Sequence, residues 1–261
     1  MFEFMTTLYT ETFGQGEPVL MLHGWAMHTG MWRDFAEEVA KTNRVLCVDL
    51  PGHGRSPSDD VGKIDVWAEK ILAVMPKEPC DLIGWSLGGN VALYLAEKYP
   101  DRVKSVILIA NNPHFLQEES WQGISKSVLD DFANNLQANV NATLIRFLSL
   151  QVRGLPEAKA ALKKIKALML ECKEPEFRDL MLGLELLQAT DSREALQKIA
   201  CPVLLVLGGK DTLVPVSVAE GCQLLRPKLE FQYIESAGHM PFITHKQQVL
   251  ALVQSFFKRV E

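Results

Sequence analysis

Short runs of consecutive apolar residues alternate along the chain with stretches in which apolar residues recur every three or four positions. The runs are typical of strands buried on both faces of a parallel sheet, and the wider spacing is typical of helices that bury one face. Six runs predict strands, at residues 18–23, 44–50, 80–85, 103–110, 202–208 and 229–234. Because helical patterns separate most of these runs, the sequence predicts βαβ units and a mainly parallel sheet flanked by helices.

The alternation stops between residues 113 and 190. No buried strand is predicted there, and helical patterns follow one another, at residues 125–138, 140–151, 156–170 and 175–189. From about residue 191, strands and helices alternate again. We therefore expect a single α/β core, residues 1–112 and 191–261, that carries a helical lid subdomain, residues 113–190. Ligands of open parallel sheets bind at the carboxyl ends of the strands, so the chemistry is expected at that edge.

Composition narrows the class of protein. A chain of 261 residues that is 48% hydrophobic and 23% charged is globular rather than disordered. The net charge of −5 disfavours a nucleic-acid-binding protein. Residues 1–18 lack the pattern of a signal peptide, and no apolar run approaches the ~18 residues of a membrane span. We expect a soluble cytoplasmic monomer that binds neither nucleic acid nor membrane.

The cysteines and histidines do not form a metal-binding pattern. The chain contains no H-E-x-x-H and no C-x-x-C motif, so we expect neither a metal ion nor another cofactor. The cysteines are odd in number and widely spaced, which predicts free thiols in a reducing compartment. They are Cys47, Cys80, Cys172, Cys201 and Cys222.

The clearest chemical signal is the segment Gly84-Trp85-Ser86-Leu87-Gly88, which lies between an apolar strand and a helical pattern. It matches the G-x-S-x-G nucleophile elbow, in which a serine on a tight strand–helix turn exposes its hydroxyl. The glycines let the strand and helix approach closely without Cβ clashes. The amide of Leu87, at the start of the helix, can donate to a developing oxyanion. A glycine-rich turn without chemistry is the alternative explanation.

A serine nucleophile needs a general base, and the base needs a carboxylate that orients it. In this architecture the order along the chain is serine, acid, histidine, each after a strand. Asp211 follows the strand predicted at 202–208, and His239 follows the strand predicted at 229–234. Alone, the aspartate could be a helix cap and the histidine a solvated loop residue. Together with Ser86, in this order, they predict a catalytic triad.

Other histidines have structural explanations. His28, His114 and His245 fit loop or helix-end positions. His53 lies in the glycine-rich segment 49–56, which follows a strand but lacks the spacing of a phosphate-binding loop. We therefore expect His53 to be structural rather than a catalytic base.

The loop that follows the first strongly apolar strand contains His23, Gly24 and Trp25. A second oxyanion donor is expected from an amide in this loop, and the amide of Trp25 is suitably placed. The Trp25 ring would then lie over the acyl pocket, and Trp85 would lie beside the nucleophile. Core packing is the alternative explanation for both rings.

The predicted lid is locally basic. Between residues 146 and 166 it carries one acidic residue, Glu157, and six basic residues: Arg146, Arg153, Lys159, Lys163, Lys164 and Lys166. Three of the lysines fall on one helix face, opposite apolar positions. These are Lys159, Lys163 and Lys166. The face is either simply solvated or a docking surface for an acidic partner near the active site.

Over nearly its whole length the chain resembles the α/β-hydrolase superfamily, and within it the pimeloyl-acyl-carrier-protein methyl ester esterases of biotin synthesis. The matching segments are MLHGWAMHTGMW, VDLPGHGRS, IGWSLGGNVA, ANNPHF, RFLSLQ and AGHMPFITH. The resemblance implies an α/β-hydrolase fold with a helical lid, a serine carboxylesterase without a cofactor, and acyl-carrier protein as the partner that bears the substrate.

The resemblance also implies residue roles. Ser86 would be the nucleophile, His239 the base and Asp211 its orienting acid, with the amides of Trp25 and Leu87 at the oxyanion. A lid phenylalanine of the acyl pocket and its neighbours would add substrate contacts: Phe147, Leu148, Ser149, Leu150 and Gln151. The basic lid would meet the carrier protein. Arg146 and Arg153 fit the family there, whereas other basic positions hold lysine, which lacks the bidentate grip of arginine.

The predicted reaction is hydrolysis of the methyl ester of pimeloyl-acyl-carrier protein to pimeloyl-acyl-carrier protein and methanol. Two alternatives stay open. One is a broad-specificity short-chain carboxylesterase, or another small-molecule hydrolase of the same fold, and the other is a ligand receptor without turnover. Haloalkane dehalogenases and epoxide hydrolases need an aspartate nucleophile where this chain has Ser86, so the sequence disfavours both.

Overall fold

A computed structural model describes residues 7–260 of the chain, and the first six residues and the last residue of the predicted core lie outside this range. The described residues form a seven-stranded sheet in the order β1-β3-β2-β4-β5-β6-β7. Only β1 is antiparallel to its neighbour. The strands are β1 (Thr10–Phe13), β2 (Pro18–Leu22), β3 (Arg44–Val48), β4 (Cys80–Trp85), β5 (Val103–Ile109), β6 (Val203–Gly208) and β7 (Glu230–Ile234). The mainly parallel sheet is as predicted, and the six predicted strands agree with β2–β7 to within two residues.

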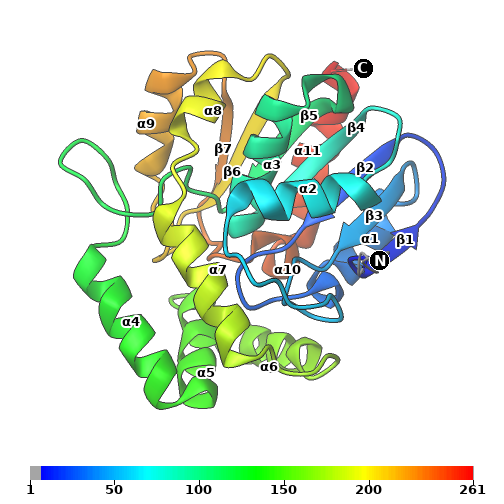
Figure 1. The fold of residues 1–261 in the computed structure, drawn as a ribbon. Helices are drawn as coiled ribbons and strands as arrows, with labels where there is room; N and C mark the ends of the chain where they lie inside the picture. The colour runs from blue at the N-terminus through cyan, green and yellow to red at the C-terminus, as the bar shows by residue number, and fades with distance from the viewer. Residues whose placement is uncertain (1–6, 261) are drawn as a thin grey trace.

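Helices cover both faces of the sheet (Figure 1). Those outside residues 113–190 (the insertion) are α1 (Arg33–Val39), α2 (Ile64–Val74), α3 (Leu87–Lys98), α8 (Arg193–Lys198), α9 (Val218–Leu225), α10 (Pro241–Thr244) and α11 (Lys246–Val260), with short 3₁₀ helices at Thr29–Met31 and Pro100–Arg102. The sequence pattern assigned neither α2 nor α8. In α2, however, Ile64, Trp67, Ala68 and Ile71 have the spacing of a helix that buries one face.

The strands are apolar throughout because both faces of the sheet are covered. In β4, Leu82 belongs to the hydrophobic cluster on one face, and Ile83 belongs to the cluster on the other. The same alternation holds in β2, with Leu20 on the first face and Met21 on the second. Successive side chains of a strand point to opposite faces, so continuous apolar runs are required here.

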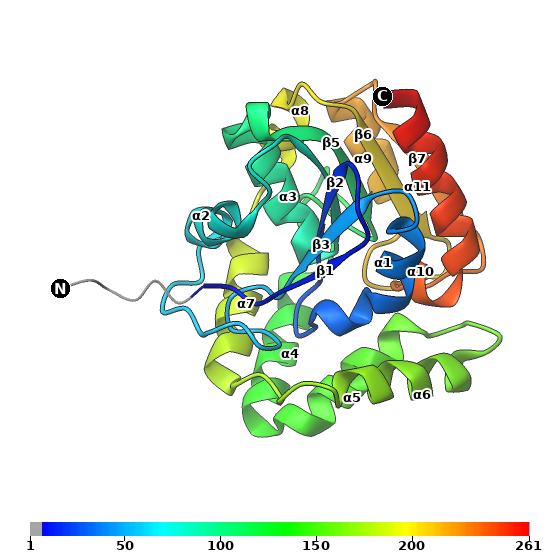
Figure 2. The same cartoon turned by 90° about the vertical axis from the view of Figure 1, so that its right-hand side faces the viewer.

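Between β5 and β6 the chain forms four helices within residues 126–189: α4 (Lys126–Ala138), α5 (Val140–Gln151), α6 (Ala158–Met169) and α7 (Phe177–Ala189). In two perpendicular views α4, α5 and α6 lie together beyond one end of the sheet (Figures 1 and 2). Each of the four predicted helical stretches overlaps one of these helices. None of the helices within residues 7–260 is both long and apolar enough to cross a membrane.

Candidate active site

Ser86 occupies the turn between β4 and α3 with φ 53° and ψ −122°, a backbone conformation that L-residues rarely adopt. The neighbouring glycines make this turn possible. A Cβ atom on Gly84 would lie 2.5 Å from Cα of Gly89, and one on Gly88 would meet the carbonyls of Leu22 and His23. The predicted elbow is therefore a tight turn with a strained backbone at Ser86. Strained backbone of this kind is found mostly at active sites and ligand-binding sites.

Asp211 and His239 lie on the loops after β6 and β7, and their side chains are hydrogen-bonded. The distance between Asp211 Oδ2 and His239 Nδ1 is 2.7 Å, and both side chains are buried. The other oxygen, Asp211 Oδ1, accepts from the amides of Leu213 at 2.8 Å and Val214 at 3.0 Å. The carboxylate is thus fixed on both oxygens, so Nδ1 of His239 is the protonated nitrogen and Nε2 is available as a base.

The backbone of His239 is held from two sides. Its carbonyl accepts a hydrogen bond of 2.9 Å from the indole Nε1 of Trp85, and its amide donates to the carbonyl of Gln151 at 3.1 Å. Trp85 itself is buried, and its ring centroid lies 5.1 Å from that of Phe242. Of the two explanations for Trp85, the structure therefore supports core packing, combined with a hydrogen bond that fixes the histidine loop.

Trp25 lies in a four-residue turn closed by a hydrogen bond from the amide of Met27 to the carbonyl of Gly24, with Ala26 at φ 61°. Such a turn uses only the amide of its last residue, so the Trp25 amide is not needed for the turn. The ring centroids of Trp25 and Phe147 lie 5.1 Å apart in an edge-on arrangement. The indole Nε1 of Trp25 donates to the carbonyl of Leu180 at 2.9 Å. This loop of the core is therefore bound to helices α5 and α7.

Ser86, His239 and Trp25 line one cavity of about 90 Å³, whose walls are otherwise apolar. The remaining lining residues are Phe115, Ile124, Val128, Leu129, Phe132, Phe147, Leu150, Leu184, Leu187 and Leu213. Most of these come from α4, α5 and α7, and the sequence analysis identified only Phe147 and Leu150 among them. The helical spacing of Leu129, Phe132 and Leu136 in α4 could have indicated an inward face.

Three residues of the predicted substrate-binding segment 147–151 do not line this cavity. Leu148 is buried in the hydrophobic cluster that contains Trp85, and the hydroxyl of Ser149 donates to the carbonyl of Ile145. Gln151 is fully buried and meets the histidine loop through its backbone carbonyl. The side chain of Leu87 is also in the core, which leaves its amide as the group that can face a substrate.

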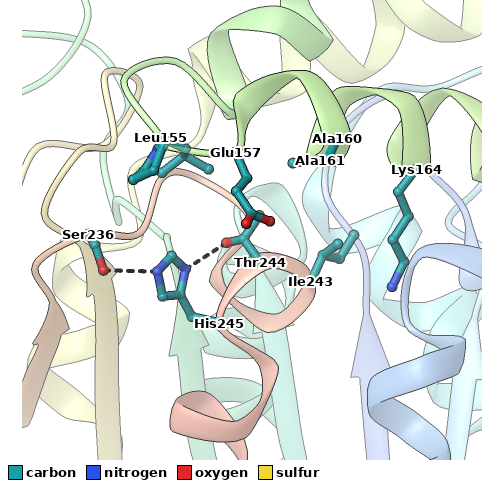
Figure 3. Close-up of a pocket in the computed structure, with 10 residues that line it drawn as sticks. Leu155, Glu157, Ala160, Ala161, Lys164, Ser236, Ile243, Thr244 and His245 are labelled. Atoms are coloured by element: carbon teal, nitrogen blue, oxygen red, sulfur yellow. Dashed lines mark hydrogen bonds between the residues drawn. The ribbon is translucent and has the colours of Figure 1, made fainter.

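The other histidines do not line this cavity. Burial lowers the pKa of His53, whose Nδ1 lies 2.8 Å from the carbonyl of Pro51. His245 lines a second, more open cavity of about 460 Å³ between α6 and α10, where its imidazole contacts Ser236 and Thr244 (Figure 3). Lys164, also on this second cavity, pairs with Asp34 at 2.6 Å.

The basic residues of the insertion are spread over several surfaces. Arg146 lines a groove between α4 and α5 that shares Val128, Phe132 and Leu150 with the active-site cavity. Another depression on α6 is lined by Lys159, Lys163 and Lys166. Arg153 is exposed just after α5. Within the described residues, no three His, Cys, Asp or Glu side chains are grouped to hold a metal ion.

The fold and the site together define the class of protein. The sequence profile of the alpha/beta hydrolase fold matches residues 17–246, and the chain belongs to this family. Two solved structures illustrate the shared fold: an esterase from Exiguobacterium antarcticum (TM-score 0.87, 24% identity, 96% of this chain and 95% of that chain) and a thermophilic esterase from Thermogutta terrifontis (TM-score 0.79, 25% identity, 97% and 93%).

Two curated relatives are more similar to this chain in sequence, and both have the same name. The chain is 35% identical to the pimeloyl-[acyl-carrier protein] methyl ester esterase of Aliivibrio fischeri over 97% of its length and 98% of that protein. It is 37% identical to the protein of that name from Aeromonas salmonicida, over 94% of this chain and 97% of the relative.

Proposed function

We propose that this protein is a serine carboxylesterase that hydrolyses the methyl ester of pimeloyl-acyl-carrier protein, releasing methanol, as a step of biotin synthesis. The observation that carries the chemical part is that His239, hydrogen-bonded to Asp211, lines the same largely apolar cavity as Ser86. The name shared by relatives that align over almost the whole chain supports the choice of substrate.

In this proposal Ser86 is the nucleophile. His239 Nε2 takes the hydroxyl proton as Ser86 attacks the ester carbonyl, and Asp211 stabilises the imidazolium that forms. His239 then gives the proton to the departing methanol. Water, activated by the same histidine, cleaves the acyl-enzyme and frees the carboxylate.

The amides of Trp25 and Leu87 would bind the oxyanion of both tetrahedral intermediates. Leu87 is the first residue of α3, and the first amides of a helix have no acceptor within the helix. The turn that contains Trp25 leaves its amide unused. Loss of one such donor typically lowers the rate by about 10²–10³.

Residues 113–190 would act as the lid that shapes the acyl site. The cavity walls supplied by α4, α5 and α7 are apolar, which suits a methylene chain better than a charged or sugar-like group. The groove between α4 and α5 shares residues with the cavity and gives the carrier-linked end of the substrate a way out. The distal methyl ester would then reach Ser86, while the thioester stays outside and escapes hydrolysis.

The carrier protein would dock on the basic residues of the lid, which are Arg146, Arg153, Lys159, Lys163 and Lys166. Charge-reversal variants can compare the groove lined by Arg146 with the α6 depression lined by the three lysines. We expect Arg146→Glu to raise KM for the carrier-bound ester more than the triple change of Lys159, Lys163 and Lys166 to Glu, because only Arg146 lines the groove that joins the cavity. Unchanged KM in both variants would refute carrier docking on Arg146 and on the three lysines.

We place the reaction in the cytoplasm and assign it to a monomer. All five cysteines are free thiols, which supports a reducing compartment. Burial raises the pKa of Cys80 and of Cys222 to about 12, so neither thiol is a reactive group at neutral pH.

The decisive experiment compares hydrolysis of the methyl ester of pimeloyl-acyl-carrier protein with that of short p-nitrophenyl esters, in wild type and in Ser86→Ala. A strong preference for the carrier-bound ester, abolished in Ser86→Ala, supports the full proposal. Activity on short esters alone would instead support a broad-specificity short-chain carboxylesterase, the alternative favoured by the small, largely apolar cavity. Retention of activity in Ser86→Ala would refute both.

A further inference from the structure

Two asparagines are buried beneath the nucleophile elbow. Asn111 follows β5 and Asn90 lies on α3, and the two residues are 1% and 0% exposed. Nδ2 of Asn111 donates to the carbonyl of Ser86 at 2.8 Å and also to Oδ1 of Asn90. The amide group fits closely against α3, since a Cβ atom on Gly89 would lie 2.6 Å from its Cγ.

Packing alone does not explain why two asparagines are buried here. Oδ1 of Asn111 and Nδ2 of Asn90 are both buried and have no hydrogen-bond partner among residues 7–260. Unpartnered amide groups in an apolar interior destabilise a fold, and an apolar pair would avoid the penalty. Among residues 7–260, the side chains of the pair form one hydrogen bond outside the pair itself, from Asn111 to the Ser86 carbonyl.

That carbonyl belongs to the same peptide unit as the amide of Leu87. A trans peptide unit is planar, so its carbonyl and its N–H point in opposite directions. The Ser86 carbonyl is held by Nδ2 of Asn111 from below and by the amide of Gly89 at 2.9 Å. Fixing the direction of this carbonyl therefore fixes the direction in which the Leu87 N–H points.

The path of the chain after β5 brings Asn111 to this position. Ala110 has φ 46°, one of three non-glycine residues with positive φ among the described residues. Just before it, the carbonyl of Ile109 accepts from the amide of Ser86 at 3.0 Å. The end of β5 thus holds both sides of Ser86, the amide through the backbone and the carbonyl through a side chain.

We propose that Asn111 is a positioning residue that aims the Leu87 amide at the oxyanion, with Asn90 holding the Asn111 side chain in place. The inference rests on the proposed function, because it assumes that Ser86 is the nucleophile and that Leu87 is an oxyanion donor. Asn111 would thus affect the reaction rate although its buried side chain does not line the active-site cavity.

The test uses Asn111→Asp, which keeps the shape of the side chain but removes the Nδ2 donor, and Asn111→Leu, which removes all polar atoms. Ser105→Ala is the matched control, because it deletes a buried side-chain hydrogen bond to Asp81 that joins β5 to β4 four residues before the two strands end at the elbow. With p-nitrophenyl acetate as substrate, we expect kcat to fall about 10–100-fold in both Asn111 variants, below the full loss of one oxyanion donor. KM should stay within about two-fold, because the donor acts in the transition state.

A second readout separates positioning from loss of folded protein. Covalent labelling by a fluorophosphonate counts the intact Ser86 sites, and a phenylboronic acid measures affinity for a tetrahedral adduct. Positioning predicts full labelling at the end point and weaker boronate binding that parallels the loss of kcat. Wild-type kcat per labelled site in Asn111→Asp, or an equal loss in Ser105→Ala, would overturn the proposal.

The outcomes distinguish this inference from the function on which it rests. If wild type hydrolyses p-nitrophenyl acetate through Ser86 but rejects the carrier-bound ester, the biotin-pathway assignment fails and the Asn111 test still stands. If no labelling occurs at Ser86 in wild type, the proposed function itself fails. A normal wild type with unaffected Asn111 variants refutes only the positioning role.

Discussion

Replacing Gly238 with alanine should impair the proposed catalytic base, His239, without changing any residue of the proposed triad. Gly238 directly precedes His239 and lies against the end of α5. A Cβ atom at position 238 would lie 2.5 Å from the carbonyl oxygen of Gln151, which is the acceptor for the His239 amide at 3.1 Å. The substitution therefore opposes the backbone hydrogen bond that joins the histidine loop to α5.

The size of the effect follows from the required movement. Real Cβ contacts shorter than 3.0 Å essentially do not occur, so the two segments must separate by at least 0.5 Å. The hydrogen bond would then exceed the usual range, with a loss of about 0.5–1.5 kcal/mol of stability. Catalytic groups must be held to within about 0.5 Å, and a displacement of about 1 Å can cost 10²-fold. We expect kcat to fall about 10–100-fold.

The assay is steady-state hydrolysis of p-nitrophenyl acetate per fluorophosphonate-labelled site, with thermal unfolding measured in parallel. Gly154→Ala is the matched control, because Gly154 lies in the turn just after α5. Its Cβ would contact nothing within 4 Å, but its φ of 77° opposes alanine by roughly 1–2 kcal/mol. We expect Gly154→Ala to lose stability and keep kcat. Wild-type kcat in Gly238→Ala, or equal losses of kcat in the two variants, would refute the reasoning.

Further predictions concern the acid, the acyl pocket and a buried histidine. Asp211→Asn should lower kcat by about 10⁴ in ester hydrolysis, because the amide would favour the wrong histidine tautomer, and a loss below ten-fold would contradict the hydrogen-bond geometry. Phe147→Ala should raise KM for long acyl esters more than for acetate, since the Phe147 ring forms a wall of the cavity, which a chain-length series would measure. Burial lowers the pKa of His53, so the unfolded chain binds a proton below about pH 6.5 that the folded chain does not, and acid destabilises the fold. In urea unfolding, His53→Phe should therefore lose less stability than wild type between pH 7 and pH 5, and parallel pH profiles would contradict this.

The insertion does more than cover the cavity. Its helices bind core loops through backbone carbonyls: Leu180 accepts from the indole of Trp25, and Gln151 accepts from the amide of His239. A third such carbonyl, that of Leu168 at the end of α6, lies 3.0 Å from Nε2 of His28. Because two of these loops supply proposed catalytic groups, α5 and α7 are part of the framework that positions the chemistry.

Much of the fold could be predicted from the sequence because its signals are local. Strands buried on both faces must be continuously apolar, and six such runs give β2–β7. By contrast, β1 is an edge strand with mostly partly exposed residues, and its four-residue sequence carries no apolar run. Its place beside β3 is decided by antiparallel pairing with residues about 35 positions away, which no local pattern reports.

The candidate chemistry could also be predicted from local patterns, because a strained strand–helix turn demands glycines around Ser86, and an acid and a histidine after later strands complete a recognisable order. The neighbours that hold these groups became visible in the folded chain: Trp85 hydrogen-bonds the histidine loop, Phe147 rather than Leu148 lines the cavity, and Asn111 lies under the elbow. Such contacts join residues that are tens of positions apart, and their geometry is set by the packing of whole helices on the sheet.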